Sequence, residues 1–161
     1  MAASACAWDT VLSRRIPRKP LSSIDLTTLA AFHLTPPEES QLDRGILLFN
    51  AGAFWEAHEA WEAIWQNRPE DGRFFIQGLI QLAAAYHQLS RKIYRGVVIH
   101  LKQARDRLKL FPPQFLGIDV APILRTIDAS MAAIQARENL ADVDWQAVKV
   151  ARIERCQRQP C

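Results

Sequence analysis

A histidine and a glutamate four residues apart are the side chains of this sequence best placed to do chemistry. His58 and Glu62 lie in the run Phe54–Trp65, whose residue pattern predicts a helix. At about 100° per residue, positions four apart share one helical face, so the imidazole and the carboxylate can meet. Together such groups can hold a metal ion, bind a small ligand or join a hydrogen-bonded network.

The face that carries this pair is predicted to be buried. Large aromatic side chains lie within about 60° of His58 on either side of the helical wheel, namely Phe54, Trp55, Trp61 and Trp65. Exposing this stripe to water would forgo the hydrophobic effect, so it must face the core. Glu59 lies at the rim. A buried imidazole and carboxylate then need further polar partners, because buried charge is costly unless it is paired.

The next predicted helix, about Arg73–Leu89, can supply such partners. It contains no formal charge from Phe74 to Ser90 and is apolar on most sides, which predicts a central position in the fold. Gln77 and Gln81 form a stripe on it, and His87 lies on another side. We hypothesise that Gln77 and Gln81 meet the His58–Glu62 pair across the interface between the helices.

Three interpretations of this polar cluster remain open. The favoured one is a structural network that fixes helix register and satisfies its own hydrogen bonds. The second is a metal-dependent enzyme of the hydrolase kind, because His58-Glu59-Ala60-Trp61-Glu62 resembles HExxH with a glutamate as its second ligand. In that case His58 and Glu62 bind the metal and Glu59 is the general base. The third interpretation is a small-ligand pocket.

The elements that must position these residues are all helical. Helices are expected from Thr35, which starts a capping box, to Gly52, and then over about 53–66, 73–89 and 93–111, with a fifth helix capped by Asp119. No stretch predicts a strand. We therefore predict an all-α, up-and-down bundle of about five helices over residues 35–140. Residues 1–34 are predicted to be a loosely attached arm, and residues 141–161 a tail that Trp145 and Val148 dock.

Composition bounds the class of protein. The 161 residues are 49% hydrophobic, which fits one domain with a substantial core. The three cysteines lack metal-ligand spacing, which predicts reduced thiols and a cytoplasmic location. No run is long and apolar enough to predict a membrane span.

The charge distribution raises a further alternative. Residues 91–109 contain seven basic residues and a single acidic one, Asp106. Such a helix could contact phosphate, but no recognition motif accompanies it, so nucleic-acid binding is the weaker alternative. The sequence identifies no cofactor and no partner, although Trp8 and Trp145 could form a surface for a homo-oligomer.

Two motifs carry a family resemblance. Residues 48–59, read as LFNAGAFWEAHE, and residues 77–87, read as QGLIQLAAAYH, resemble the family called domain of unknown function 309 (DUF309). The resemblance covers about residues 40–111 and implies a small helical up-and-down bundle, with no activity attached. Its hallmark positions map onto Phe54, Trp55, Glu56, His58, Glu59, Gln77, Gly78 and Gln81.

Taken together, the sequence predicts an intracellular binding or interaction module. No residue is assigned a catalytic role. The candidate cluster comprises Trp55, His58, Glu59, Glu62, Trp65, Gln77, Gln81 and His87.

Overall fold

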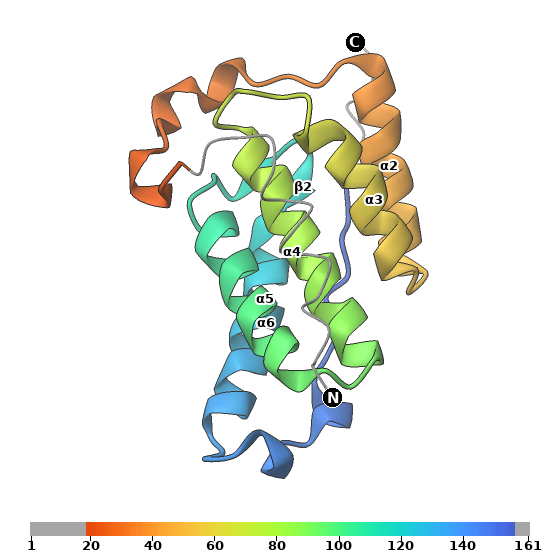
Figure 1. Cartoon of the computed structure of the whole chain (residues 1–161). Helices are drawn as coiled ribbons and strands as arrows, with labels where there is room; N and C mark the ends of the chain where they lie inside the picture. The colour runs from red at the N-terminus through yellow and green to blue at the C-terminus, as the bar shows by residue number, and fades with distance from the viewer. Residues whose placement is uncertain (1–18, 157–161) are drawn as a thin grey trace, which may run out of the picture.

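The structure is a computed structural model that describes residues 19–156, and it is built from helices (Figure 1). Within these residues the α-helices are α2 (Pro36–Asn50), α3 (Phe54–Trp65), α4 (Arg73–Ser90), α5 (Tyr94–Leu108) and α6 (Val120–Gln135). Short 3₁₀ turns flank them: η1 (Leu21–Ser23), η2 (Leu26–Ala31), η3 (Leu140–Asp142) and η4 (Trp145–Ala147). The predicted all-α bundle is confirmed. Trp8, Cys6 and Cys161 lie outside the described residues.

The predicted helix starts are visible as hydrogen bonds. The backbone N–H of Thr35 donates to Glu38 Oε2 at 2.8 Å, which closes the capping box at the start of α2. Asp119 caps α6, since its side chain accepts from the backbone N–H of Ala121 at 3.3 Å. Gly52, at φ +85°, supplies the left-handed residue after α2. Local chemistry therefore decides where these helices begin and end.

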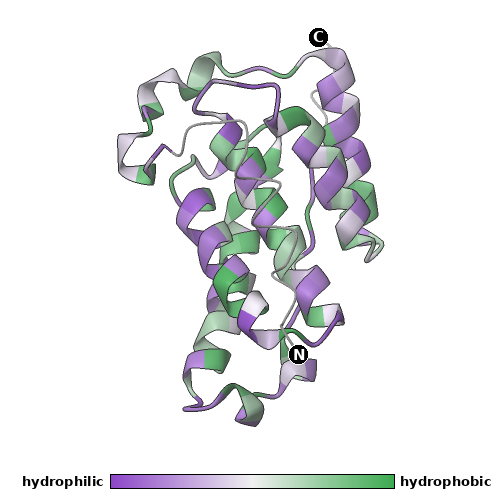
Figure 2. Ribbon diagram, viewed as in Figure 1, coloured by the Kyte–Doolittle hydropathy of each residue, from purple (hydrophilic) through white to green (hydrophobic). Residues whose placement is uncertain are grey.

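Helix α4 is the centre of the bundle. It packs between α3 and α5, while α2 packs on the other side of α3 and α6 contacts α5. Most of α4 is inaccessible to solvent, as its uncharged sequence requires. The outer helices are amphipathic, and Figure 2 shows hydrophilic and hydrophobic turns alternating along α2 and α5. The polar residues of α4 are consequently held between neighbouring helices.

The contact between α2 and α3 depends on a tryptophan against a glycine. Trp61 is fully buried, and its indole N–H donates to the Leu42 carbonyl at 3.2 Å. A Cβ on Gly45 would lie 2.1 Å from Trp61 Nε1, so only glycine leaves room for the ring. This close approach fixes α3 against α2 and thereby orients the face that carries His58.

A short hairpin that the sequence analysis did not expect joins α5 to α6. Strands β1 (Gln114–Phe115) and β2 (Ile118–Asp119) pair antiparallel through a turn at Leu116 and Gly117, both at positive φ. Two-residue strands are too short to show a period of alternation, which is why the pattern gave no signal. The hairpin matters because it receives the C-terminal segment.

Residues 148–156 run back along the bundle as an extended segment. The Ala151 N–H donates to the Tyr86 hydroxyl at 2.9 Å, and Asn50 exchanges two hydrogen bonds with the backbone of Ile153. Val148, as expected, is buried. Trp145 stacks on Tyr94 with ring centroids 4.3 Å apart. The division of the chain at residues 34 and 140 stays a prediction.

Among the described helices none has the length and apolarity needed to cross a membrane.

Candidate functional site

The aromatic helix α3 presents His58 and Glu62 inward. Their side chains are 5% and 11% exposed, and His58 Nδ1 lies 3.8 Å from Glu62 Oε2. The structure therefore confirms the wheel argument that these two polar groups share the buried face. Glu59, on the same helix, is exposed.

The environment of His58 favours the neutral imidazole. Burial, together with the nearby His100 and His87, lowers its pKa to about 4. These three histidines, from α3, α4 and α5, form what we call the histidine cluster: His58, His87 and His100. Burial also lowers the pKa of His87, with Arg91 adding to the effect. His58 is consequently uncharged near neutral pH.

The pKa of Glu62 is shifted upward, in the direction opposite to that of His58. Burial raises its pKa, the exposed Glu59 raises it further, and a hydrogen bond from Gln66 lowers it. Its Oε1 atom is buried and has no hydrogen-bond partner among the described residues. A buried acceptor without a donor costs about 1–3 kcal/mol, so this oxygen marks a position where a donor is missing.

Trp55 forms the outer wall of the site. Its ring stacks on His58 with centroids 5.6 Å apart and meets His87 at 5.5 Å. At 37% exposure it reaches solvent while His58 does not. The indole therefore covers His58, while His87 and His100 remain partly exposed.

The two glutamines of α4 bond toward α5. Gln81 Oε1 lies 2.7 Å from His100 Nδ1, and Gln77 Oε1 accepts from Arg107 Nε at 2.9 Å. Gln81 thus contacts the histidine cluster through His100, whereas Gln77 accepts a hydrogen bond from Arg107, nearer the C-terminal end of α5. The sequence hypothesis gave Gln77 and Gln81 the partners His58 and Glu62 on α3. The hydrogen bonds of the two glutamine oxygens lead instead to α5.

Two further donors lie buried at the other end of the α3–α4 interface. Trp65 Nε1 and Arg73 Nε have no hydrogen-bond partner among the described residues. The Arg73 guanidinium lies over the Trp65 and Phe74 rings, 5.8 and 5.1 Å from their centroids, and burial lowers its pKa. Arg73 was not predicted, because an arginine at a helix start looks like a surface residue in a sequence.

His100 is the principal residue of the cluster to which sequence reasoning assigned no definite place. It lies on α5, outside both motifs, and its position follows only from the packing of α5 on α4. The sequence offered only its place on the helix predicted over about residues 93–111.

The metal alternative gains no third ligand. Within residues 19–156 no group of three or more His, Cys, Asp or Glu side chains is arranged to hold a metal ion. His58 and Glu62 would have to bind the ion as a pair, and a structural or catalytic zinc site needs at least three protein ligands.

The basic residues of α5 are partly engaged within the fold. Arg105 pairs with Asp128 of α6, and Lys109 pairs with Asp106. Arg107 is directed to Gln77, and burial lowers its pKa. These three basic side chains are therefore bonded within the chain.

Comparison with known families agrees with the motifs. The model of a family described as domain of unknown function (DUF309) matches residues 42–100. The match extends from α2 to the middle of α5 and includes every residue of the histidine cluster. The resemblance drawn from the sequence is confirmed over this range. A search of curated proteins finds no match to the chain.

Proposed function

We propose that this chain is a binding module, and that its site is the histidine cluster together with Trp55, Glu62 and Gln81. The ligand is a small molecule that donates a hydrogen bond. The observation that carries the proposal is the buried Glu62 Oε1 atom, which has no donor among the described residues. A donor group on a ligand would complete this carboxyl and recover the cost of its burial.

The surroundings of Glu62 suit such a ligand. With a pKa of about 4, His58 is neutral at pH 7, so its ring offers one donor and one acceptor and repels neither cations nor neutral molecules. Trp55, stacked on His58, supplies an aromatic surface that is partly exposed. A polar group recognised between an imidazole and an aromatic wall is typical of small-molecule sites.

The test is a titration of the full chain with three small probes: acetamide and methylammonium, which donate hydrogen bonds, and acetate, which only accepts them. Binding is followed by the NMR signals of the His58 imidazole and the Trp55 indole. We expect the donors to shift both signals and acetate to leave them unchanged. Acetate binding equal to that of the donors, or no shift with any probe, would contradict the proposal.

Two matched variants test whether binding depends on Glu62 itself or on any carboxylate of α3. Glu62→Gln removes the carboxyl, while Glu59→Gln removes an exposed carboxyl three residues earlier on the same helix. The first change keeps one acceptor oxygen but replaces the other by an amide nitrogen, so it is expected to weaken the donor-induced shifts, whereas the second is expected to preserve them.

A stability measurement distinguishes binding from the structural-network interpretation. If Glu62 serves a ligand, Glu62→Gln removes a buried carboxyl group that has an unpaired oxygen, and leaves the free energy of unfolding at pH 7 unchanged or higher. If Glu62 serves helix register, the same change lowers the free energy of unfolding by about 1 kcal/mol or more. Urea denaturation of the two chains decides between these roles.

A further inference from the structure

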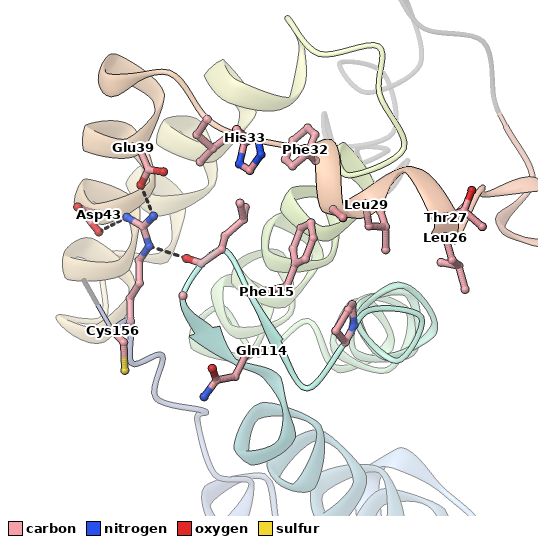
Figure 3. A pocket seen from close by; sticks show the side chains of 16 residues that line it. Leu26, Thr27, Leu29, Phe32, His33, Glu39, Asp43, Gln114, Phe115 and Cys156 are labelled. Atoms are coloured by element: carbon pink, nitrogen blue, oxygen red, sulfur yellow. Dashed lines mark hydrogen bonds and ion pairs between the residues drawn. The ribbon is translucent and has the colours of Figure 1, made fainter. Parts of the chain in front are cut away.

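A separate cavity lies between the N-terminal 3₁₀ segment, the first half of α2 and the β1–β2 hairpin (Figure 3). Its volume of about 830 Å³ lies in the range of small-molecule sites. The residues that line it come from four parts of the chain, around positions 26–34, 39–43, 112–117 and 155–156. They do not include the residues of the histidine cluster.

One wall of the cavity is apolar and firmly packed. Phe32 of the N-terminal segment stacks on Phe115 of β1, with ring centroids 6.1 Å apart and an interplanar angle of 16°. Both rings are buried, and Phe32 is also covered by the Arg68 guanidinium, 5.3 Å from its centroid. Leu26, Leu29 and Leu116 extend this wall. It presents an apolar surface to the cavity.

The opposite wall is charged. Arg155 lies between Glu39 and Asp43 of α2, bonded to both, and its Nε donates to the Leu116 carbonyl at 2.7 Å, as the dashed lines in Figure 3 show. Each of its three nitrogens therefore donates to an oxygen of the protein. Its side chain is 11% exposed, and the two carboxylates raise its pKa against the effect of burial.

This arrangement leaves negative charge facing the cavity. Two carboxylates and one guanidinium sum to −1, and the carboxylates are the accessible members, with Glu39 42% and Asp43 40% exposed. An anion would have to displace Glu39 or Asp43 from Arg155. A cation can instead use the outward side of the carboxylates, whose oxygens have lone pairs to spare.

We propose that this cavity binds a small organic cation, a protonated amine or guanidine attached to an apolar body. The apolar body packs on the Phe32–Phe115 wall, and the cationic group hydrogen-bonds to Glu39 and Asp43. Charge complementarity and the two-sided lining together select this class of ligand over a fatty acid, a phosphate ester or a neutral hydrocarbon.

The first experiment compares three probes of one shape on the isotope-labelled full chain: 2-phenylethylamine, 2-phenylethanol and 3-phenylpropionate. Binding is measured by the shifts of the Leu116 and Gly117 amides. The amine should bind about tenfold more tightly than the alcohol, since a hydrogen bond to a charged group contributes about that factor, and the carboxylate should bind more weakly still. Equal binding of amine and alcohol, tighter binding of the carboxylate, or no shift of these amides overturns the proposal.

The second experiment uses variants. Glu39→Gln and Asp43→Asn should each weaken amine binding about tenfold and leave alcohol binding unchanged. Glu59→Gln, outside the cavity, is the control and should leave both unchanged. If either variant loses the C-terminal segment, the probe series on the unmodified chain still decides. Shifts of the same amides on dilution without any probe would show that a second copy fills the cavity, and would overturn the proposal.

The readouts keep this cavity distinct from the histidine cluster. Amine binding here moves Leu116 and Gly117, whereas binding at the cluster moves His58 and Trp55. Either proposal can therefore fail while the other stands.

Discussion

His58 Nδ1 and Glu62 Oε2 approach to 3.8 Å on one face of α3, yet the two groups are not a charged pair. An ion pair would raise the pKa of the histidine and lower that of the glutamate. The reverse is found: burial, together with His100 and His87, lowers the His58 pKa to about 4, and burial raises the pKa of Glu62. Their contact is that of a neutral imidazole beside a carboxyl group whose ionisation is disfavoured.

The lowered His58 pKa predicts a loss of stability in acid. Between pH 6.5 and about 4 the unfolded chain binds a proton at this residue that the folded chain does not, so the free energy of unfolding falls as the pH falls. At pH 4.5 the loss due to His58 should be on the order of 2–3 kcal/mol. The raised pKa of Glu62 acts in the opposite sense, and His87 in the same sense.

Urea denaturation at pH 7 and pH 4.5, with and without His58→Gln, isolates this contribution because the other groups are present in both chains. The variant should show a flatter dependence on pH. His33→Gln, at an exposed position, should keep the dependence of the unmodified chain. A His58→Gln chain with an unchanged slope would contradict the assignment.

Gly45→Ala should destabilise the α2–α3 contact. The new Cβ would lie 2.1 Å from Trp61 Nε1 and cannot be accommodated unless the buried indole moves and gives up its hydrogen bond to Leu42. The expected loss in free energy of unfolding is about 2–4 kcal/mol. Gly96→Ala is the control, because its Cβ would meet the Gln88 side chain at 3.1 Å, a smaller clash; equal effects would show that the Trp61 contact is unimportant.

Tyr86→Phe should loosen the C-terminal segment. The Tyr86 hydroxyl, whose pKa burial raises to about 12, accepts the Ala151 N–H at 2.9 Å in the core. Without it that N–H is buried with no acceptor, which costs about 1–3 kcal/mol. Hydrogen exchange at Ala151 should accelerate accordingly. Tyr94→Phe keeps the stacking on Trp145 and should leave exchange at Ala151 unchanged.

Gly117→Ala should detach the end of the chain from the hairpin. Gly117 has φ +77°, and an added Cβ would lie 2.6 Å from the Cys156 carbonyl oxygen. The backbone strain alone costs about 1–2 kcal/mol. The hydrogen bond from Cys156 N to Gly117 O, 2.9 Å long, should open, and faster exchange of the Cys156 amide would report it. An unchanged exchange rate would show that the turn tolerates a side chain.

Local patterns were sufficient to predict the helices and the inward face of α3. The spacing of the aromatic residues around His58, the capping box at Thr35 and the cap at Asp119 each act within a few residues of sequence. Such features depend on helical geometry alone, so they can be read without knowing the neighbours.

The partners of the polar groups depended on how the helices pack. Gln77 and Gln81 bond across to α5 because α4 lies between α3 and α5, and no periodicity encodes that choice. The cavity is a stronger case, since Arg155 reaches Asp43 across 112 positions of sequence. Contacts between residues so far apart in the sequence form only when the C-terminal segment docks beside the hairpin. The sequence therefore shows the charged residues but not that they meet.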